Sequence, residues 1–391
     1  MQNQLHLAAN TAVSSGGEGL AAIRYAESLA LAGCNVTLLS KNFSSANNDV
    51  GYVKGSFSLE LSPLRTNILQ EIFVQYLFIK KLCEQRNIQV IHLHGMWSPF
   101  LAVAALVAWR WGIPLVISPH GCLEPWALGY KHRKKWLALK LYQGAILRSA
   151  SLFVATANQE LESIRQLRIR QAVAVIPNGV DIEQSVRRVD SNKTVKIILF
   201  LSRVNPKKGL HDLVEAWSVV RQPGWKIVIA GGDEEGYRAK LESLIRTKEL
   251  EAEFEFVGFV DGVRKQDCFD KADIFILPTY SENFGIAVAE ALANELPVIT
   301  TTGAPWQVLL DNDCGWWVAP GVEGISSALI EAMMCETSEL REMGRRGHQL
   351  VKDKFSWDNI GVTALEVSEW LLDNSLPKPL VVNQSRAKTD R

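Results

Sequence analysis

The stretch SENFGIAVAE places two carboxylates, Glu282 and Glu290, around a glycine and an apolar run. Carboxylates near a helix N-terminus can be simple partners of the helix dipole. They can also accept hydrogen bonds from the hydroxyl groups of a ligand, because an ionised carboxylate is only an acceptor. A helix beginning near Phe284 to Ile286 would also direct its first backbone N–H groups toward a phosphate or toward sugar oxygens. This stretch is therefore a candidate binding site.

A group of cations follows an apolar run upstream of that stretch. Arg203, Lys207 and Lys208 lie in SRVNPKKGL, and Gly209 is expected to open a helix. Two or three cations at a helix N-terminus suit a pyrophosphate. A solvated basic loop is the other interpretation, and the loop alone does not decide between the two.

Glycines and histidines follow strand-like runs in the first half of the chain. Gly16 and Gly17 in SSGGEGL can bring backbone N–H groups close to an anion, although a glycine pair is more often a turn. The order G-G-E-G differs from the dinucleotide fingerprint G-x-G-x-x-G, which makes an oxidoreductase the least favoured alternative. His120 follows PLVIS, and IHLHG contains His92 and His94. A lone histidine is usually structural, but one at the carboxyl end of a buried strand is a better candidate than average.

The elements that must position these residues alternate along the whole chain. Short apolar runs rich in β-branched residues are separated by longer amphipathic stretches, which predicts parallel sheets covered on both faces. The rhythm pauses at residues 176–193 and then repeats. We therefore predict an α/β protein with two Rossmann-like doubly wound domains facing an interdomain cleft. Ligands of such sheets bind beyond the carboxyl ends of the strands, which is where the candidate residues lie.

The expected domains are an N-terminal Rossmann-like domain over residues 1–178 and a C-terminal Rossmann-like domain over residues 179–375. The second ends in a closing helix, and residues 376–391 are expected to form a flexible tail. A length of 391 residues agrees with two domains.

Composition excludes several classes of protein. Lys plus Arg and Asp plus Glu are equal at 42 each, so no overall charge indicates a nucleic-acid partner. The six cysteines form no CxxC pair, which argues against a zinc ribbon and a disulfide framework and fits a reducing cytoplasm. The start lacks a signal-peptide pattern, and the apolar run at residues 99–109 is too short to cross a bilayer.

Residues 130–148, YKHRKKWLALKLYQGAILR, are basic at one end and apolar after it, with Trp126 and Trp136 nearby. This pattern suits a helix on the surface of an anionic membrane. The other interpretation is a surface helix whose apolar face packs on the core.

Taken together, cations, amides and carboxylates in these positions suit a nucleoside-diphosphate sugar. At this point the sequence resembles glycosyltransferase family 4, which has the GT-B fold, over nearly its whole length. The most specific piece is the Glu-x7-Glu motif from Glu282 to Glu290, with SRVNPKKGL, GFV at 258–260 and GGEG at the matching places. SPHGCLEPWALGYKHRKKW and CGWWV further resemble bacterial enzymes of O-antigen and exopolysaccharide synthesis.

The resemblance implies a role for each carboxylate. Glu290 would bind the ribose hydroxyls of the donor. Glu282 would hold hydroxyls of the transferred sugar, assisted by backbone amides at the start of the helix, namely those of Asn283, Phe284, Gly285 and Ile286.

The resemblance also implies that residues 1–178 bind the acceptor and that residues 179–375 bind the nucleotide-sugar donor. It gives roles to the remaining candidates as well. Arg203 and Lys208 would neutralise the leaving diphosphate, and Gly16 and Gly17 would close over it from the other domain. His120 would lie near the reacting carbon. The backbone around Phe259 would touch the base.

The family is retaining and metal-independent, so the resemblance implies no cofactor beyond the donor substrate itself. Stabilisation of the leaving group and positioning would then carry the reaction without a protein nucleophile. The sequence DND at Asp311 to Asp313 matches the DxD pattern of metal-dependent glycosyltransferases, but Asp and Asn are also ordinary turn residues.

The expected function is a cytoplasmic retaining hexosyltransferase of surface polysaccharide synthesis, including lipopolysaccharide, acting on a saccharide acceptor, with a lipid-linked one favoured. Contact with the inner face of the membrane through residues 130–148 would make it a peripheral membrane protein. The alternatives are a GT-B epimerase or hydrolase of nucleotide sugars, and a non-catalytic nucleotide-sugar-binding protein.

Overall fold

The computed structural model describes residues 1–11, 17–42, 57–64, 67–182 and 194–384. The chain forms two compact units, one made of Met1–Gly179 with Trp357–Arg391 and the other of Val180–Ser356. Within the described residues, no helix combines the length and the apolar character that a membrane span requires.

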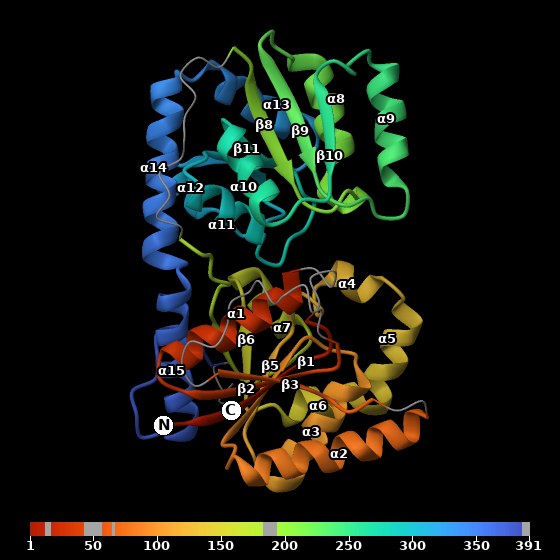
Figure 1. The fold of residues 1–391 in the computed structure, drawn as a ribbon, viewed down its shortest axis with the longest axis vertical. Helices are drawn as coiled ribbons and strands as arrows, with labels where there is room; N and C mark the ends of the chain where they lie inside the picture. The colour runs from red at the N-terminus through yellow and green to blue at the C-terminus, as the bar shows by residue number, and fades with distance from the viewer. Residues whose placement is uncertain (12–16, 43–56, 65–66, 183–193, 385–391) are drawn as a thin grey trace, which may run out of the picture. The chain divides into compact units, whose positions relative to one another are not determined.

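The first unit is built on an eight-stranded sheet in the order β14-β7-β6-β5-β4-β1-β2-β3 (Figure 1). All neighbouring strands are parallel except β14, which runs antiparallel to β7. The strands are β1 Asn3–Ala8, β2 Asn35–Ser40, β3 Phe57–Leu61, β4 Val90–His94, β5 Leu115–Ser118, β6 Leu152–Ala155, β7 Ala172–Val175 and β14 Val382–Asn383.

Helices cover both faces of this sheet and enclose two hydrophobic cores. One core lies under α2, α3 and α6, and the other lies under α1 and α15. The helices are α1 Gly17–Leu31, α2 Ile68–Gln85, α3 Pro99–Trp111, α4 Pro125–Gly129, α5 His132–Ala138, the π-helical turn η3 Leu139–Gln143, α6 Gly144–Ser149, α7 Asn158–Gln166 and α15 Trp357–Leu372.

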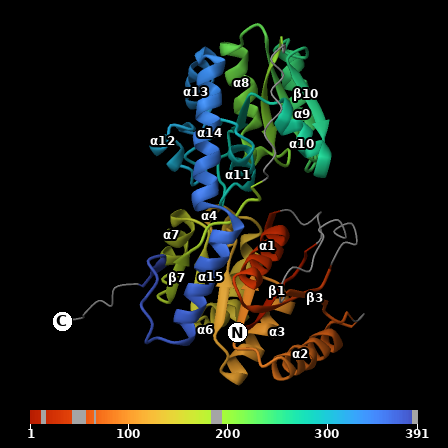
Figure 2. The same cartoon turned by 60° about the vertical axis from the view of Figure 1, so that its left-hand side comes forward.

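The C-terminal helix corrects one expectation from the sequence. α15 packs beside α1 in the first unit, as both views show (Figures 1 and 2), and does not close the second domain. The close approach uses Gly361, where a Cβ atom would lie 2.2 Å from the carbonyl oxygen of Ser28. Residues 357–375 therefore belong with the first unit, because their apolar face completes its core.

The expected tail is also partly ordered. Val382 and Asn383 add a strand to the edge of the first sheet beside β7, and Arg165 donates a hydrogen bond of 2.9 Å to the carbonyl oxygen of Asn383. A prediction from proline and charge alone misses such edge pairing, because the partner strand lies about two hundred residues earlier in the chain. Residues 385–391 lie outside the described residues.

The second unit contains a six-stranded parallel sheet in the order β10-β9-β8-β11-β12-β13. The strands are β8 Lys196–Leu201, β9 Trp225–Ala230, β10 Phe254–Gly258, β11 Ile274–Leu277, β12 Val298–Thr301 and β13 Gly315–Val318. The helices are η4 Pro206–Lys208, α8 Leu210–Val220, α9 Tyr237–Thr247, α10 Gly262–Lys271, α11 Ile286–Ala293, α12 Val308–Asp311, α13 Val322–Met334 and α14 Thr337–Lys354.

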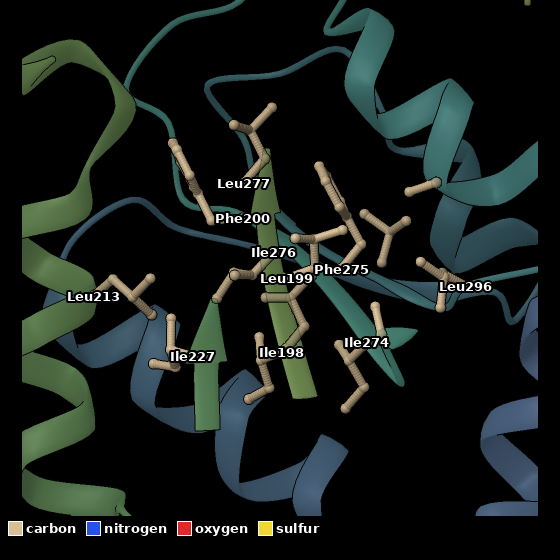
Figure 3. Packing of buried hydrophobic residues seen from close by; sticks show 14 of the residues in the cluster. Ile198, Leu199, Phe200, Leu213, Ile227, Ile274, Phe275, Ile276, Leu277 and Leu296 are labelled. Atoms are coloured by element: carbon tan, nitrogen blue, oxygen red, sulfur yellow. The ribbon is translucent and has the colours of Figure 1, made fainter. Parts of the chain in front are cut away.

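The central strands of this sheet are apolar on both faces. Figure 3 shows Ile198 and Phe200 of β8 beside Ile227, Phe275 and Ile276 from the neighbouring strands, all of them fully buried. Burying one such side chain contributes about 1.5–3 kcal/mol. The apolar runs therefore fold as covered parallel strands, and the predicted class of two Rossmann-like units is confirmed.

Each sheet has one place where the strand order reverses. In the first unit, β1 is followed by β2 on one side and has β4 on the other. In the second unit, β8 is followed by β9 on one side and has β11 on the other. Such a switch point opens a crevice at the carboxyl ends of the two strands, where ligands of open α/β sheets bind.

Candidate functional site

Two loops meet at the switch point of the second unit, one after β8 and one after β11. Gly209 ends the first loop with φ 70°, and a Cβ atom there would lie 1.9 Å from the carbonyl oxygen of Pro278 in the second. The N–H of Tyr280 donates a hydrogen bond of 2.9 Å to the carbonyl oxygen of Lys207. Only glycine allows this approach, which brings Lys208 and Glu282 together.

Lys208 and Glu282 form an ion pair between these two loops. Their side chains are only 9% and 13% exposed. A buried ammonium and a buried carboxylate each lose water, and each compensates the other's charge. The pair offers three donors and an acceptor at one point of the crevice, which is the chemistry needed to bind both an anion and hydroxyl groups.

The helix α11 begins where the sequence predicts, with Gly285 as its N-cap at φ 82° and Ile286 as its first residue. Phe284 is buried, and its carbonyl oxygen accepts a hydrogen bond of 2.6 Å from Trp306 Nε1–H. This contact anchors the turn from Glu282 through Asn283 into the helix. The first amides of α11 therefore have a fixed position beside the ion pair.

Glu290 lies in α11 and has a partner of its own. Its carboxylate accepts a 2.6 Å contact from Lys265 Nζ of α10, with the two side chains 19% and 29% exposed, respectively. The sequence motif located Glu290 but gave no indication of Lys265, because α10 reaches this position only through the fold. Phe259 follows β10 and is 58% exposed.

Arg203 is placed differently from Lys208. Its side chain is 63% exposed and forms a 2.8 Å contact with Glu234, although both cations were predicted to face one diphosphate. Asn205 binds the second oxygen of the same carboxylate. The structure brings Lys208 and Glu282 together and holds Arg203 at Glu234.

The switch point of the first unit lies beside the start of α1. Gly17 is the exposed first residue of that helix, whereas Gly16 lies outside the described residues. Glu18 follows, and a Cβ atom on Gly95 would lie 1.9 Å from its Oε1. Part of this side chain is exposed, but loss of water around the carboxylate raises its pKa to about 7. Sequence reasoning passed over Glu18, and the acid within GGEG was the signal available.

His120 stands at the end of a chain of hydrogen-bonded histidines. Its Nε2 lies 3.2 Å from His94 Nδ1, and His94 Nε2 lies 3.0 Å from His6 Nδ1. His6 Nε2 lies 3.2 Å from Gln4 Oε1. Burial lowers the pKa of His6 to about 3 and that of His120 to about 4, and it lowers the pKa of His94 well below its usual value.

These contacts assign the tautomers of the neutral rings. Gln4 Oε1 is only an acceptor, so His6 carries its proton on Nε2 and accepts at Nδ1. His94 must then donate from Nε2 and accept at Nδ1, and His120 must donate from Nε2. The Nδ1 of His120 is left as an acceptor. The residue also has φ 49°, a strained conformation that is more common at functional sites.

Two groups of side chains could be considered as metal ligands. Among the described residues, His6, His92 and His94 are the one group found with ligand atoms close enough, within 4.8 Å of one another. Their nitrogens already bind one another, Gln4 and Ser118. Asp311 ends α12 before the turn that leads to β13, and no such group within the described residues includes it.

Glu160 is a buried residue that the sequence did not single out. Its carboxylate accepts hydrogen bonds of 2.6 Å from the N–H of Gly121 and 2.8 Å from the N–H of Thr156. It thereby joins the loop after β5, which carries His120, to the loop after β6. Burial raises the pKa of Glu160 to about 7. An acid near a helix start is too common a pattern to indicate this role.

The basic stretch at 130–148 forms α5, η3 and α6 as a continuous helical run. It contains six Lys and Arg residues and no acidic residue. Trp136, Leu137 and Leu141 are 50%, 50% and 71% exposed, while Leu147 is buried. One side of the run packs on the core, as the second interpretation expects, and another side presents apolar and cationic groups to solvent. Membrane contact stays a prediction.

Comparison with known proteins extends this description. Residues 15–184 match the family model "Glycosyltransferase Family 4", and residues 181–349 match "Glycosyl transferases group 1". The chain is 28% identical over 200 residues to a putative colanic acid biosynthesis glycosyltransferase of Escherichia coli, an alignment covering 48% of each chain. The chain spans about half the length of that relative and of an uncharacterized glycosyltransferase from the archaeon Methanocaldococcus jannaschii.

A longer alignment links the chain to the GDP-mannose:cellobiosyl-diphosphopolyprenol alpha-mannosyltransferase of Xanthomonas campestris. The two are 24% identical over 281 residues, which cover 70% of this chain and 72% of the relative. Among solved structures, HepE of Anabaena, in complex with UDP and glucose, has a TM-score of 0.74 at 17% identity. That match covers 96% of this chain and all of the other, and it shows a shared GT-B fold.

Proposed function

The chain belongs to the glycosyltransferases, with a family 4 domain followed by a group 1 domain, and we propose that it transfers a sugar from a nucleoside-diphosphate sugar to a saccharide acceptor. One observation carries this proposal: the buried Lys208–Glu282 pair at the switch point of the second unit. A cation beside a hydroxyl acceptor matches the two halves of a sugar diphosphate.

In the proposed donor complex, the diphosphate binds Lys208 and the amides at the start of α11. Glu282 then accepts hydrogen bonds from the hydroxyls of the sugar. Glu290 turns from Lys265 to the ribose, and the backbone at Phe259 contacts the base. Arg203 is the second cation for the diphosphate, and it must leave Glu234 to act.

In the proposed reaction, the bond between the anomeric carbon and the diphosphate oxygen breaks. The acceptor oxygen bonds to that carbon on the same face, and the hydroxyl proton passes to the leaving phosphate oxygen. The configuration is retained. Lys208 stabilises the charge that develops on the diphosphate, and such fixed charges account for much of the rate in enzymes. We propose that no metal ion is required.

The proposed acceptor is a lipid-linked saccharide of surface polysaccharide synthesis, bound by the first unit near His120. Two observations support a lipid-linked acceptor: the cationic and apolar surface of residues 130–148, and the polyprenol named for the Xanthomonas relative. The enzyme would work in the cytoplasm, in contact with the anionic inner face of the membrane through this segment.

The first test measures the melting temperature with UDP, GDP, ADP and their common sugar conjugates. A ligand that binds only the folded protein stabilises it by about 2.7 kcal/mol at one hundred times its dissociation constant. One nucleotide should raise the melting temperature, and its sugar conjugate should raise it further. No shift with any of them would contradict the assignment of the donor site.

A second test separates transfer from the alternative activities. With the donor identified, membranes from the source cell would be supplied as acceptor, and the product would be analysed by NMR. An α-configured donor should give an α-linked product. Inversion would contradict the proposed mechanism. Sugar release or isomerisation without acceptor would favour a hydrolase or epimerase, and tight binding without turnover would favour a binding protein.

A further inference from the structure

An apolar groove lies on the first unit between α3 and the helical run η3–α6. Its volume is about 570 Å³, within the range of small-molecule sites. Ten of its twelve lining residues are apolar, and the other two, Tyr142 and Ser149, carry a hydroxyl group. The apolar residues include Pro99, Leu106, Trp109, Leu141 and Ile146. Three of these side chains are strongly exposed, with Leu106 at 50%, Trp109 at 68% and Leu141 at 71%. A recessed apolar surface of this kind is unfavourable in water.

The groove begins near the carboxyl end of β4, whose last residue, His94, contacts His120. Pro99 is the first residue of α3, shortly after β4 ends at His94. At the same end, Tyr142 donates a hydrogen bond of 3.3 Å to the carbonyl oxygen of Trp97. From Pro99 to Trp109 the helix advances about 15 Å, at 1.5 Å per residue. The groove is thus a path that leads away from the strand ends along α3.

A cation and a strained residue lie near the end of the groove marked by Pro99 and Tyr142. Trp97 has φ 69°, and its indole N–H is buried without a hydrogen-bond partner among the described residues. Lys135 Nζ lies 5.5 Å from the centre of the Trp97 ring. A non-glycine residue in this conformation and an unsatisfied buried donor are both costly, and such costs concentrate at functional sites. The charge here is suited to an anionic head group.

The wall formed by η3 has an unusual backbone. Leu139–Gln143 is a π-helical turn, and it places Leu141 and Tyr142 along the groove. A π-helical turn inside an α-helical run is rare and occurs frequently at functional sites. The sequence has an α-helical pattern here, so it does not predict the π-helical turn that places these two side chains on the wall of the groove.

We propose that this groove binds the polyprenyl chain of a lipid-linked acceptor, with its phosphate near Lys135 and its apolar chain running along α3. The proposal rests on the proposed function, because it names the lipid part of that acceptor. The occupant must be linear and apolar, because the groove is long and lined almost entirely by hydrocarbon. It must also carry an anion at the end near Pro99, where Lys135 lies beside Trp97. Residues 130–148 contain no acidic residue that could balance this positive charge.

The test measures binding of farnesyl diphosphate to the full chain by isothermal titration calorimetry, with inorganic pyrophosphate and dodecyl phosphate as comparison ligands. Farnesyl diphosphate should bind at least tenfold more tightly than either. The substitution Ala145→Trp fills the groove from its exposed side and should weaken farnesyl diphosphate binding at least tenfold. Leu137→Trp, on the same helical run but outside the groove, is the matched control and should bind as the wild type does.

Equal affinity for farnesyl diphosphate and pyrophosphate would overturn the proposal, as would unchanged binding in Ala145→Trp. Equal affinity for dodecyl phosphate would overturn the choice of a polyprenyl chain. If Ala145→Trp does not fold, Leu106→Glu is the second variant. It places a carboxylate on the exposed rim of the groove and should weaken farnesyl diphosphate binding in the same way.

The nucleotide melting experiment keeps this proposal separate from the function. A nucleotide shift without prenyl binding removes the groove and leaves the glycosyltransferase assignment. Binding of farnesyl diphosphate without a nucleotide shift supports the groove and contradicts the assignment of the donor site.

Discussion

At the scale of single residues, the Lys208–Glu282 pair links the structure to the proposed chemistry. Among the described residues, each of these charged groups has the other as its ion-pair partner, and both side chains are largely buried. A ligand that brings a diphosphate to the lysine and hydroxyls to the carboxylate would replace this contact with two better matched ones. The pair therefore keeps the ammonium and the carboxylate side by side, where the proposed donor would meet both.

Removing the lysine should weaken nucleotide binding. Lys208→Ala is expected to reduce the affinity for the nucleoside diphosphate identified by thermal shift by about 1–3 kcal/mol, the loss of a charge-assisted contact. Isothermal titration calorimetry measures the change. Lys226→Ala, an exposed cation at the start of β9, serves as the control. Unchanged affinity in Lys208→Ala would remove this residue from the diphosphate site.

Changing the carboxylate should affect turnover more than nucleotide binding. Glu282→Ala removes the proposed acceptor for sugar hydroxyls, so the transfer rate should fall more than the affinity for the bare nucleoside diphosphate. Steady-state kinetics and calorimetry on the same variant give the two values. The opposite order would place Glu282 away from the sugar.

At this scale, the sequence singles out a residue where a spacing carries the signal, and the functional roles of those residues stay predictions. The positions of Glu282, Glu290 and Lys208 follow from motifs, whereas Lys265 and Glu160 do not. Both of the latter act through partners that are distant in sequence or through backbone N–H groups. Such pairs form only when the strands set the distance between loops, so one sequence gives no trace of them.

At the scale of elements, Gly209 decides whether two loops can meet. Gly209→Ala should destabilise the second unit by at least about 2 kcal/mol, because φ 70° is unfavourable for alanine and its Cβ would overlap the backbone at Pro278. Urea unfolding measures the loss. Gly232→Ala is the matched control, since nothing lies within 4 Å of a Cβ there. Equal stability of the two variants would contradict the close approach.

The buried histidines should make the stability of the first unit depend on pH. Folding lowers the pKa of His6 from 6.5 to about 3, so the unfolded chain binds a proton that the folded chain does not. The stability from the neutral ring is present above pH 6.5 and is lost as the pH falls toward 3.

The expected slope for one such histidine is about 1.4 kcal/mol per pH unit. His6→Gln should reduce the slope of unfolding free energy between these limits by that amount. Chemical denaturation at a series of pH values tests it, and His211→Gln, with a side chain 59% exposed, is the comparison. An unchanged slope in His6→Gln would show that His6 is protonated in the folded protein.

Elements were predictable where one pattern dominates. The apolar strands of both sheets follow from their composition, but the composition of β3 does not predict a strand, because FSLEL is short and contains an acid. The π-helical turn was also missed, because its sequence has the α-helical period. The assignment of α15 to the second domain failed because an amphipathic helix does not show which of two cores it covers.

At the scale of the whole molecule, transfer should not depend on a divalent ion. Activity is expected to survive EDTA and dialysis, because Lys208 and the helix amides supply the positive charge for the diphosphate. The transfer rate before and after chelation tests this. Loss of activity that Mn²⁺ restores would contradict it and would direct attention to Asp311, Asp313 and the histidine group.

The two-unit organisation followed from the sequence because the alternation of strands and helices pauses once and restarts. The return of the chain to the first unit at Trp357 did not follow from the sequence. The boundary between Ser356 and Trp357 lies between two helical patterns, without a turn-rich linker to mark it.

The return of α15 to the first unit also determines the order in which the protein can be completed during synthesis. Ile360, Ala364 and Val367 fill part of the core beneath α1, so the first unit is completed only after α15 has been synthesised, which is later than every residue of the second unit. The unit in the middle has all its residues by Ser356. Although domains at the N-terminus generally fold first, here the second unit can fold while the first still has an open apolar face, which a chaperone could bind.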